Sequence, residues 1–163
     1  KEFNLPLNSW NVSNVTNMSY MFYNTKEFNS NINNWDVSNV EDMEGMFYEA
    51  SAFNQDIGNW NVSNVTNMKG MFLYSRNFNQ NINNWDVSSV TNMSKMFSYA
   101  NTFNQPIGNW NTSNVIDMSS MFSYAKSFNN IHSSNGVGLH TDIYSTNRIG
   151  IHNGDISKWD VSA

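Results

Sequence analysis

Hydrophobic residues recur along this chain at fixed offsets with a period of 25 residues, and polar residues fill the positions between them. Tryptophan stands at 10, 35, 60, 85 and 110, and the stretch after each one follows the pattern W-x-V-S-N-V-T-N-M-x-x-M-F-x-x-A. Repeats of 20 to 50 residues are typical of proteins built from stacked units. Because no single unit can bury its own Trp, Phe, Met and Val side chains, we expect each unit to cover the next.

Two elements are predicted within each unit. The segment W-x-V-S alternates apolar and polar residues and favours β-formers, which predicts a short strand. The segment V-x-x-M-x-x-M-F-x-x-A places apolar residues three and four apart, which predicts a helix or tight helical turn, with the threonine after the second valine available as a cap. The pattern therefore predicts an α/β repeat solenoid with short parallel strands on one face and helical turns opposite.

The repeat also predicts which side chains are buried. We expect Trp, both Val, both Met and the two Phe of each unit to point inward, and asparagine amides to bond the backbone in the bends and to stack on the same asparagine one coil away. The residue after each tryptophan is expected on the outer face of the sheet. These residues are Asn11, Asp36, Asn61, Asp86, Asn111 and Asp160.

The chain is predicted to form one domain over residues 1–163. Regular repeats cover 3–128, a degenerate repeat or loop insertion covers 129–151, and the repeat resumes over 152–163, where Trp159 stands 49 residues after Trp110. Because the chain begins inside the pattern and stops where another unit would begin, we interpret it as a fragment of a longer protein.

The unit F-N-x-x-I-x-x-W-[DN]-V-S-N-V-T-N-M-x-x-M-F resembles the repeat of the BspA-like leucine-rich-repeat surface proteins, of the domain of unknown function 285 (DUF285) type found in mycoplasma surface lipoproteins. The resemblance covers residues 3–128 and resumes at 152–162. It implies a right-handed coil of leucine-rich-repeat type, display on a bacterial cell surface or secretion, and a part in adhesion.

Composition and charge exclude several classes of function. The chain has a net charge of -5 and no run of Lys or Arg that could follow a phosphate backbone, which argues against nucleic-acid binding. It has no cysteine, so disulfides, thiolate zinc sites and cysteine nucleophiles are excluded. No apolar run approaches the roughly 18 residues of a membrane-spanning helix.

Candidate catalytic and metal-binding residues are few. His132, His140 and His152 lie near Asp142 and Asp155, but their spacing matches no short metal-ligand motif, so we expect no metal and no cofactor.

Two further carboxylates recur along the repeat. Asp36 and Asp86 recur two units apart on an expected flat face without a cleft, which favours a role in solubility over acid-base catalysis. We therefore expect that the protein is not an enzyme.

Tyrosine is the residue type most suggestive of a binding site. One tyrosine lies one or two residues after each Met-Phe pair, so the five are expected to form a ladder along one flank and to contact a ligand. These residues are Tyr23, Tyr48, Tyr74, Tyr99 and Tyr124. The alternative is that they pack only as spacers between coils.

Two functions follow from the repeat and the resemblance. The favoured one is a surface module that binds a protein or glycan of a host or neighbouring cell across an extended repeated face. The alternative is a structural spacer or self-associating element of a surface coat.

Overall fold

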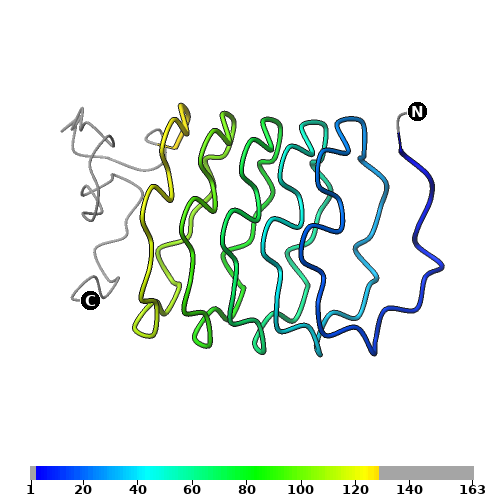
Figure 1. Ribbon diagram of the computed structural model, residues 1–163, viewed down its shortest axis with the longest axis horizontal. Coiled ribbons are helices and arrows are strands. Elements are labelled where there is room, and N and C mark those ends of the chain that lie inside the picture. Colours follow the sequence, from blue (N-terminus) through cyan, green and yellow to red (C-terminus); the bar gives the residue numbers. More distant parts are fainter. Residues whose placement is uncertain (1–2, 129–163) are drawn as a thin grey trace.

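The computed structural model describes residues 3–128 of the chain, which wind as a stack of 25-residue coils. Successive coils lie side by side along the long axis of the molecule, from the first coil in blue to the last described coil in yellow (Figure 1). Over these residues the backbone forms neither a helix nor an extended strand. The regular pairing consists of isolated parallel bridges, one between each coil and the next: Asn17↔Asp42, Asp42↔Asn67, Asn67↔Asn92 and Asn92↔Asp117.

The prediction of an α/β solenoid with helical turns is therefore wrong, and backbone dihedrals in the M-x-x-M-F segment give the reason. In the first coil Tyr20 and Asn24 have φ of 56° and 57°, a left-handed conformation that a right-handed helix cannot contain. Each is the third residue of a turn, closed by the Met21 amide donating to the Met18 carbonyl and the Thr25 amide donating to the Phe22 carbonyl, both at 3.2 Å. A positive φ at that place in the turn defines a type II turn.

Tandem turns imitate the helical pattern because each turn returns the chain to the same side after three residues. The two methionines of a unit, such as Met43 and Met46, occupy the first and last places of one turn and are both buried. The same spacing of three on a helix would also put both side chains on one face. Apolar spacing alone therefore did not separate the two structures.

The predicted strand at W-x-V-S is also wrong. In the second coil this segment forms a turn, in which the Val40 amide donates to the Val37 carbonyl at 2.9 Å. The segment predicted to be helical is the one that pairs with its neighbour, since Met43, Gly45 and Phe47 donate amides to carbonyls of the following coil at 2.9 Å. These bonds satisfy backbone groups that would otherwise be buried without partners.

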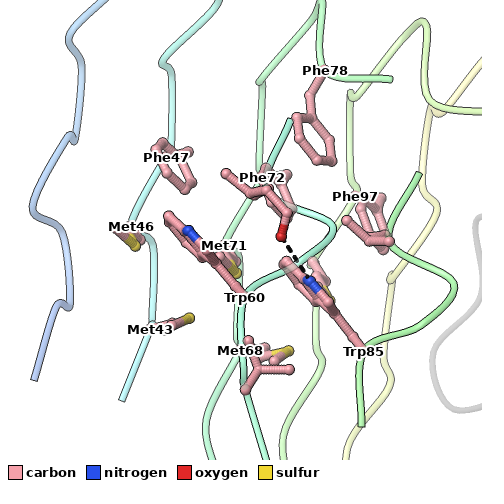
Figure 2. Packing of buried hydrophobic residues seen from close by; sticks show 14 of the residues in the cluster. Met43, Met46, Phe47, Trp60, Met68, Met71, Phe72, Phe78, Trp85 and Phe97 are labelled. Atoms are coloured by element: carbon pink, nitrogen blue, oxygen red, sulfur yellow. Dashed lines mark hydrogen bonds between the residues drawn. The ribbon is translucent and has the colours of Figure 1, made fainter. Parts of the chain in front are cut away.

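The predicted inward-pointing residues form the core. Phenylalanine rings from the two ends of a unit interleave, with Phe72 stacked on Phe78 at 3.9 Å and on Phe97 of the next coil at 5.6 Å, and methionines fill the space beneath them (Figure 2). From the second coil onward the phenylalanine and tryptophan side chains are no more than 4% exposed, so burial is confirmed there. The first coil differs, because Trp10 is 52% exposed and Met21 36% exposed.

Polar groups hold the coils in register. Each buried indole donates to a carbonyl of the preceding coil, as Trp85 Nε1 does to Ile57 O at 3.1 Å (Figure 2). The predicted asparagine bonds to the backbone are confirmed, since Asn54 Oδ1 accepts the amide of Asn79, the equivalent residue one coil on, at 2.9 Å.

The residues after the tryptophans are exposed but do not lie on a sheet, because no sheet forms over residues 3–128. Each of the five described ones, as Asn61 does for Ser63, accepts the amide of the residue two positions later and so begins a turn. Asp160, and the predicted degenerate and resumed repeats over 129–163, lie outside the described residues.

Candidate functional site

The five predicted tyrosines form a continuous row along one edge of the stack. The ring centroids of Tyr23 and Tyr48 are 4.9 Å apart, and those of Tyr48 and Tyr74 are 6.2 Å apart. Toward the C-terminal end the spacing is 4.3 Å from Tyr74 to Tyr99 and 4.4 Å from Tyr99 to Tyr124. The coil stack therefore brings together side chains that lie 25 or 26 residues apart in the sequence. We call these five residues the tyrosine row.

The row consists of two groups with different backbone positions. Tyr23 and Tyr48 directly follow the Met-Phe pair, whereas Tyr74, Tyr99 and Tyr124 stand one position later, where φ is 58° to 59°. The first two rings are tilted by 46°, and the last three are nearly parallel, at 11° and 18°. The shift by one position therefore coincides with a change from a tilted pair of rings to a regular stack. We call the three residues of this stack, Tyr74, Tyr99 and Tyr124, the C-terminal trio.

The tyrosine row is more exposed than the other aromatic rows of the stack. Tyr23 and Tyr124 are 48% and 41% exposed, and the three rings between them are half-buried. Since the rings of the C-terminal trio cover one another's faces, the part of Tyr99 that remains in contact with solvent is its edge. The edge of an aromatic ring carries partial positive charge.

A polar network surrounds the N-terminal end of the row. Tyr20 Oη donates to Glu44 Oε1 at 2.6 Å, Lys69 Nζ lies 3.0 Å from the same oxygen, and Asn67 Nδ2 donates to Glu44 Oε2 at 3.1 Å. The hydrogen bond from Tyr20 lowers the pKa of Glu44, and the bond to the Glu44 carboxylate raises the pKa of Tyr20 to about 12. Burial, followed by the charge of Glu49, raises the pKa of Tyr48.

Sequence reasoning missed the part that Tyr20 plays in this network. Its ring lies over Gly45, the equivalent residue of the next coil, and a Cβ atom there would come within 2.5 Å of Tyr20 Cε1. The edge-on contact between Tyr20 and Tyr23, at 6.2 Å and 86°, joins Tyr20 to the tyrosine row. The exchange of Tyr for Gly between two otherwise similar units was the available signal.

Positive charges accompany the C-terminal trio. Arg76 and Lys126 follow Tyr74 and Tyr124 by two residues, Lys95 precedes Tyr99 by four, and all three side chains are exposed. Over residues 3–128 the structure contains one ion pair, that of Lys69 with Glu44, so none of the three cations pairs with a carboxylate of this part of the chain. Counting repeat positions would have revealed the coincidence, because Arg76 and Lys126 occupy the same position two units apart.

The other predicted candidates do not assemble into a site. Asp36 and Asp86 each accept a hydrogen bond from the serine two positions later at 2.6 Å, and this bond lowers the pKa of both carboxyls. Both carboxyl groups are therefore ionised, and each stabilises the turn in which it lies. The histidines and their neighbouring aspartates, His132, His140, His152, Asp142 and Asp155, lie outside the described residues.

The described part of the chain has neither a metal-binding cluster nor a membrane-spanning helix. Between residues 3 and 128 no three His, Cys, Asp or Glu side chains cluster in a way that would hold a metal ion. The same residues include no helix with the length and apolar character needed to cross a bilayer.

Comparison with known proteins yields one family. The model of the family described as "Mycoplasma protein of unknown function, DUF285" matches residues 1–72 and, in a second overlapping match, residues 55–146. The two matches agree with the tandem repeat and confirm the DUF285 part of the resemblance. No curated protein and no solved structure matches the chain.

Proposed function

Because the chain belongs to the DUF285 family of repeat-containing proteins, we propose that it is a non-enzymatic module of a bacterial cell surface, displayed there or secreted. In this proposal it mediates adhesion by binding a protein or glycan of a host or neighbouring cell. The tyrosine row is the contact surface. The repeated coil supplies a rigid support on which equivalent side chains recur at a fixed spacing.

The single observation that carries the proposal is the exposure of aromatic rings at strained backbone positions. Tyr74, Tyr99 and Tyr124 have φ of 58° to 59°. A left-handed backbone costs roughly 1–2 kcal/mol for most residues and is tolerated best by glycine and asparagine. Asn24 and Glu49 occupy the equivalent position of the first and second coils, with φ of 57° and 59°. The tyrosine side chain, and not its backbone preference, is therefore what suits this position.

Stacking within the tyrosine row is similar in size to that strain, and the coils do not need it to stay joined. Aromatic pairs contribute about 0.5–1.5 kcal/mol beyond the area that they bury. The inner rows already join the coils through fully buried rings such as Phe72 and Phe97. Residues kept in sparsely populated conformations tend to cluster at ligand-binding sites. This supports recognition over a spacer role for the C-terminal trio.

A second candidate function has its own observation. The first coil exposes large apolar side chains, with Leu5 at 62% and Trp10 at 52% exposure. Apolar surface of this kind favours association with another surface. It supports the alternative of a structural spacer or self-associating element that stacks end to end.

A binding screen with three variants tests the first proposal. The purified 163-residue chain is exposed to extracellular-matrix proteins, mucins and a glycan panel, alongside the triple variant Tyr74→Asn, Tyr99→Asn, Tyr124→Asn. Asparagine accepts the left-handed backbone, so the variant should fold. The matched control is Asn59→Ser, Asn84→Ser, Asn109→Ser, because these exposed residues lie in the bends before the tryptophans and Ser9 occupies the same position in the first coil.

The expected result is a saturable ligand that is lost in the tyrosine variant and kept in the control. Binding that survives in the tyrosine variant would contradict the proposal. Light scattering on the same samples addresses the second candidate. End-to-end association predicts oligomers that dissociate on the substitution Trp10→Ser, and no binding to any member of the panel.

A further inference from the structure

We propose that the C-terminal trio, together with Arg76, Lys95 and Lys126, binds an anionic polysaccharide. This inference rests on the proposed function and narrows it to one class of ligand. Two independent features carry it: the way in which the rings are stacked, and the placement of positive charge beside them.

The ring geometry selects against neutral sugars. A sugar that packs on an aromatic side chain needs an open ring face, but Tyr74 and Tyr124 lie against the two faces of Tyr99, at 4.3 Å and 4.4 Å and nearly parallel. The part of Tyr99 left exposed between them is the ring edge, which carries partial positive charge, and a phenol is able to donate a hydrogen bond. Both suit carboxylate or sulfate oxygens, which accept hydrogen bonds and carry negative charge.

Cations lie along the chain on both sides of the trio. Lys95 stands at the repeat position before the rings, and Arg76 and Lys126 stand at the position after them. Residues 70–128 contain two acidic residues, Asp86 and Asp117. In each, a carboxylate oxygen accepts a hydrogen bond from the backbone amide of the serine two positions later. Three positive residues, Arg76, Lys95 and Lys126, against these two aspartates leave residues 70–128 with a net charge of +1, although the whole chain has a net charge of -5.

The spacing of the cations suits a polymer. Arg76 and Lys126 occupy equivalent positions two coils apart, or roughly 10 Å if coils are spaced like neighbouring strands. A chain with at least one acidic group in each disaccharide can meet both cations in one extended conformation. Several weak charge contacts on one chain add up to useful affinity, whereas an exposed pair alone contributes little.

The same features disfavour a nucleic acid. Single-stranded nucleic acids bind through bases stacked on open aromatic faces, and both faces of Tyr99, the central ring, are covered by neighbouring rings. Nucleic-acid duplexes are held by many phosphate contacts, whereas only three cations, Arg76, Lys95 and Lys126, accompany the trio.

The N-terminal part of the tyrosine row has the opposite charge. Glu44 and Glu49 accompany Tyr23 and Tyr48. Lys26 stands at the repeat position of Arg76 but is followed directly by Glu27, and the positive charge of Lys69 is used in the pair with Glu44. Anions are therefore expected to bind at the C-terminal part of the row and not along its whole length.

The test measures binding of the 163-residue chain to immobilised heparin, hyaluronan and dextran at several salt concentrations. Heparin supplies sulfates and carboxylates, hyaluronan supplies carboxylates alone, and dextran is neutral. The variant Arg76→Gln, Lys126→Gln, which we call the trio variant, removes two of the positive charges beside the trio. The matched control Lys26→Gln, Lys69→Gln removes two positive charges from the N-terminal half of the stack. The triple Tyr→Asn variant is measured in parallel.

We expect saturable, salt-sensitive binding to heparin or hyaluronan and none to dextran. The trio variant should bind roughly tenfold more weakly and the control within about twofold of the parent chain. Equal losses in the trio variant and the control, or equal binding to dextran, would overturn the inference. The proposed function would survive that result if the triple Tyr→Asn variant still lost a protein or neutral-glycan ligand. Absence of any ligand in both screens would overturn both proposals.

Discussion

Two kinds of aromatic row run along this molecule with the same 25-residue period, one inside the coils and one on their edge. The inner phenylalanines keep one register throughout, are buried and stack at nearly constant spacing, as Phe47, Phe72 and Phe97 do at 5.6 Å. The tyrosine row shifts by one position between Tyr48 and Tyr74, and its rings remain partly exposed.

The difference separates the requirements of the fold from those of a surface. A core row tolerates no shift, because displacing one ring by a residue would turn it out of the coil and leave a cavity. The edge row accepts a shift because solvent lies on one side of it. Stability should therefore depend on the inner rows, and ligand binding on the edge row.

The largest expected effect comes from opening the inner row. Phe72 is fully buried between rings of its own and neighbouring coils. Phe72→Ala should reduce the free energy of unfolding by about 3–5 kcal/mol, since it removes the buried ring and leaves a cavity. Urea denaturation followed by tryptophan fluorescence measures the change. A loss below about 1 kcal/mol would mean that the inner row does not carry the fold.

A pair of glycine substitutions sharpens the comparison at the N-terminal end. Gly45 and Gly70 share a φ of 58°, so Gly→Ala should cost about 1–2 kcal/mol at either position. A Cβ at Gly70 meets its nearest atom at 3.7 Å, whereas one at Gly45 would displace the Tyr20 ring. Gly45→Ala should therefore be the more destabilising in thermal unfolding. Equal losses of stability in the two variants would show that the packing of the Tyr20 ring on Gly45 does not stabilise the fold.

A stabilising change tests the inner valine row. Thr112 stands where the other described units have valine, is buried, and has a hydroxyl oxygen without a hydrogen-bond partner among residues 3–128. Thr112→Val keeps the shape and removes the unsatisfied group, so the free energy of unfolding should rise by about 1–2 kcal/mol. Chemical denaturation measures it, with Thr16→Val as a control at an exposed threonine. A loss of stability in Thr112→Val would contradict the conclusion that the Thr112 hydroxyl is buried and unsatisfied.

The edge row should behave differently from the inner row. Tyr99→Asn loses ring stacking on both sides but relieves the left-handed backbone, and the two effects are of similar size, so stability should change by less than about 1.5 kcal/mol. The same denaturation assay used for Phe72→Ala provides the measurement. A loss as large as that of Phe72→Ala would make the tyrosine row part of the core and would favour the spacer interpretation.

The smallest expected effect is a pH dependence confined to the first two coils. The pKa of Tyr20 is raised to about 12, so the folded state holds this proton more tightly than the unfolded state does. The stabilisation is complete below pH 10 and is lost as the pH rises from 10 to about 12. Thermal unfolding across this range should show a decline that Tyr20→Phe reduces. An unchanged decline in the variant would exclude the Tyr20–Glu44 hydrogen bond as its source.

The sequence allowed the inner rows to be predicted but not the backbone that carries them. Burial of Trp, Met and Phe followed from their period, because any stack of such units must cover the same side chains. The backbone could not be read in the same way, since tandem type II turns and a helix both return side chains to one face after three residues. Glycine signals a left-handed residue at Gly45 and Gly70, but Lys95 and Ser120 occupy the equivalent position in later units.

The candidate site was predictable in part for the same reason. Tyrosine positions alone indicated a ladder, and the structure places the five rings in one row. The change in ring geometry at Tyr74 could not be foreseen, because it depends on a φ value that tyrosine rarely adopts. The charges beside the trio were visible in the sequence, but their relation to the rings emerges only when equivalent positions of successive coils are placed side by side.

The most direct test of the division between inner and edge rows is an NMR titration of the 18.7 kDa chain with heparin fragments. Chemical-shift changes should concentrate at the rings of Tyr74, Tyr99 and Tyr124 and at residues around Arg76, Lys95 and Lys126, while the indole signals of the buried tryptophans stay in place. Changes centred on Leu5 and Trp10 at the exposed end of the first coil, or spread evenly over the bends before the tryptophans, would contradict the assignment of recognition to the edge row.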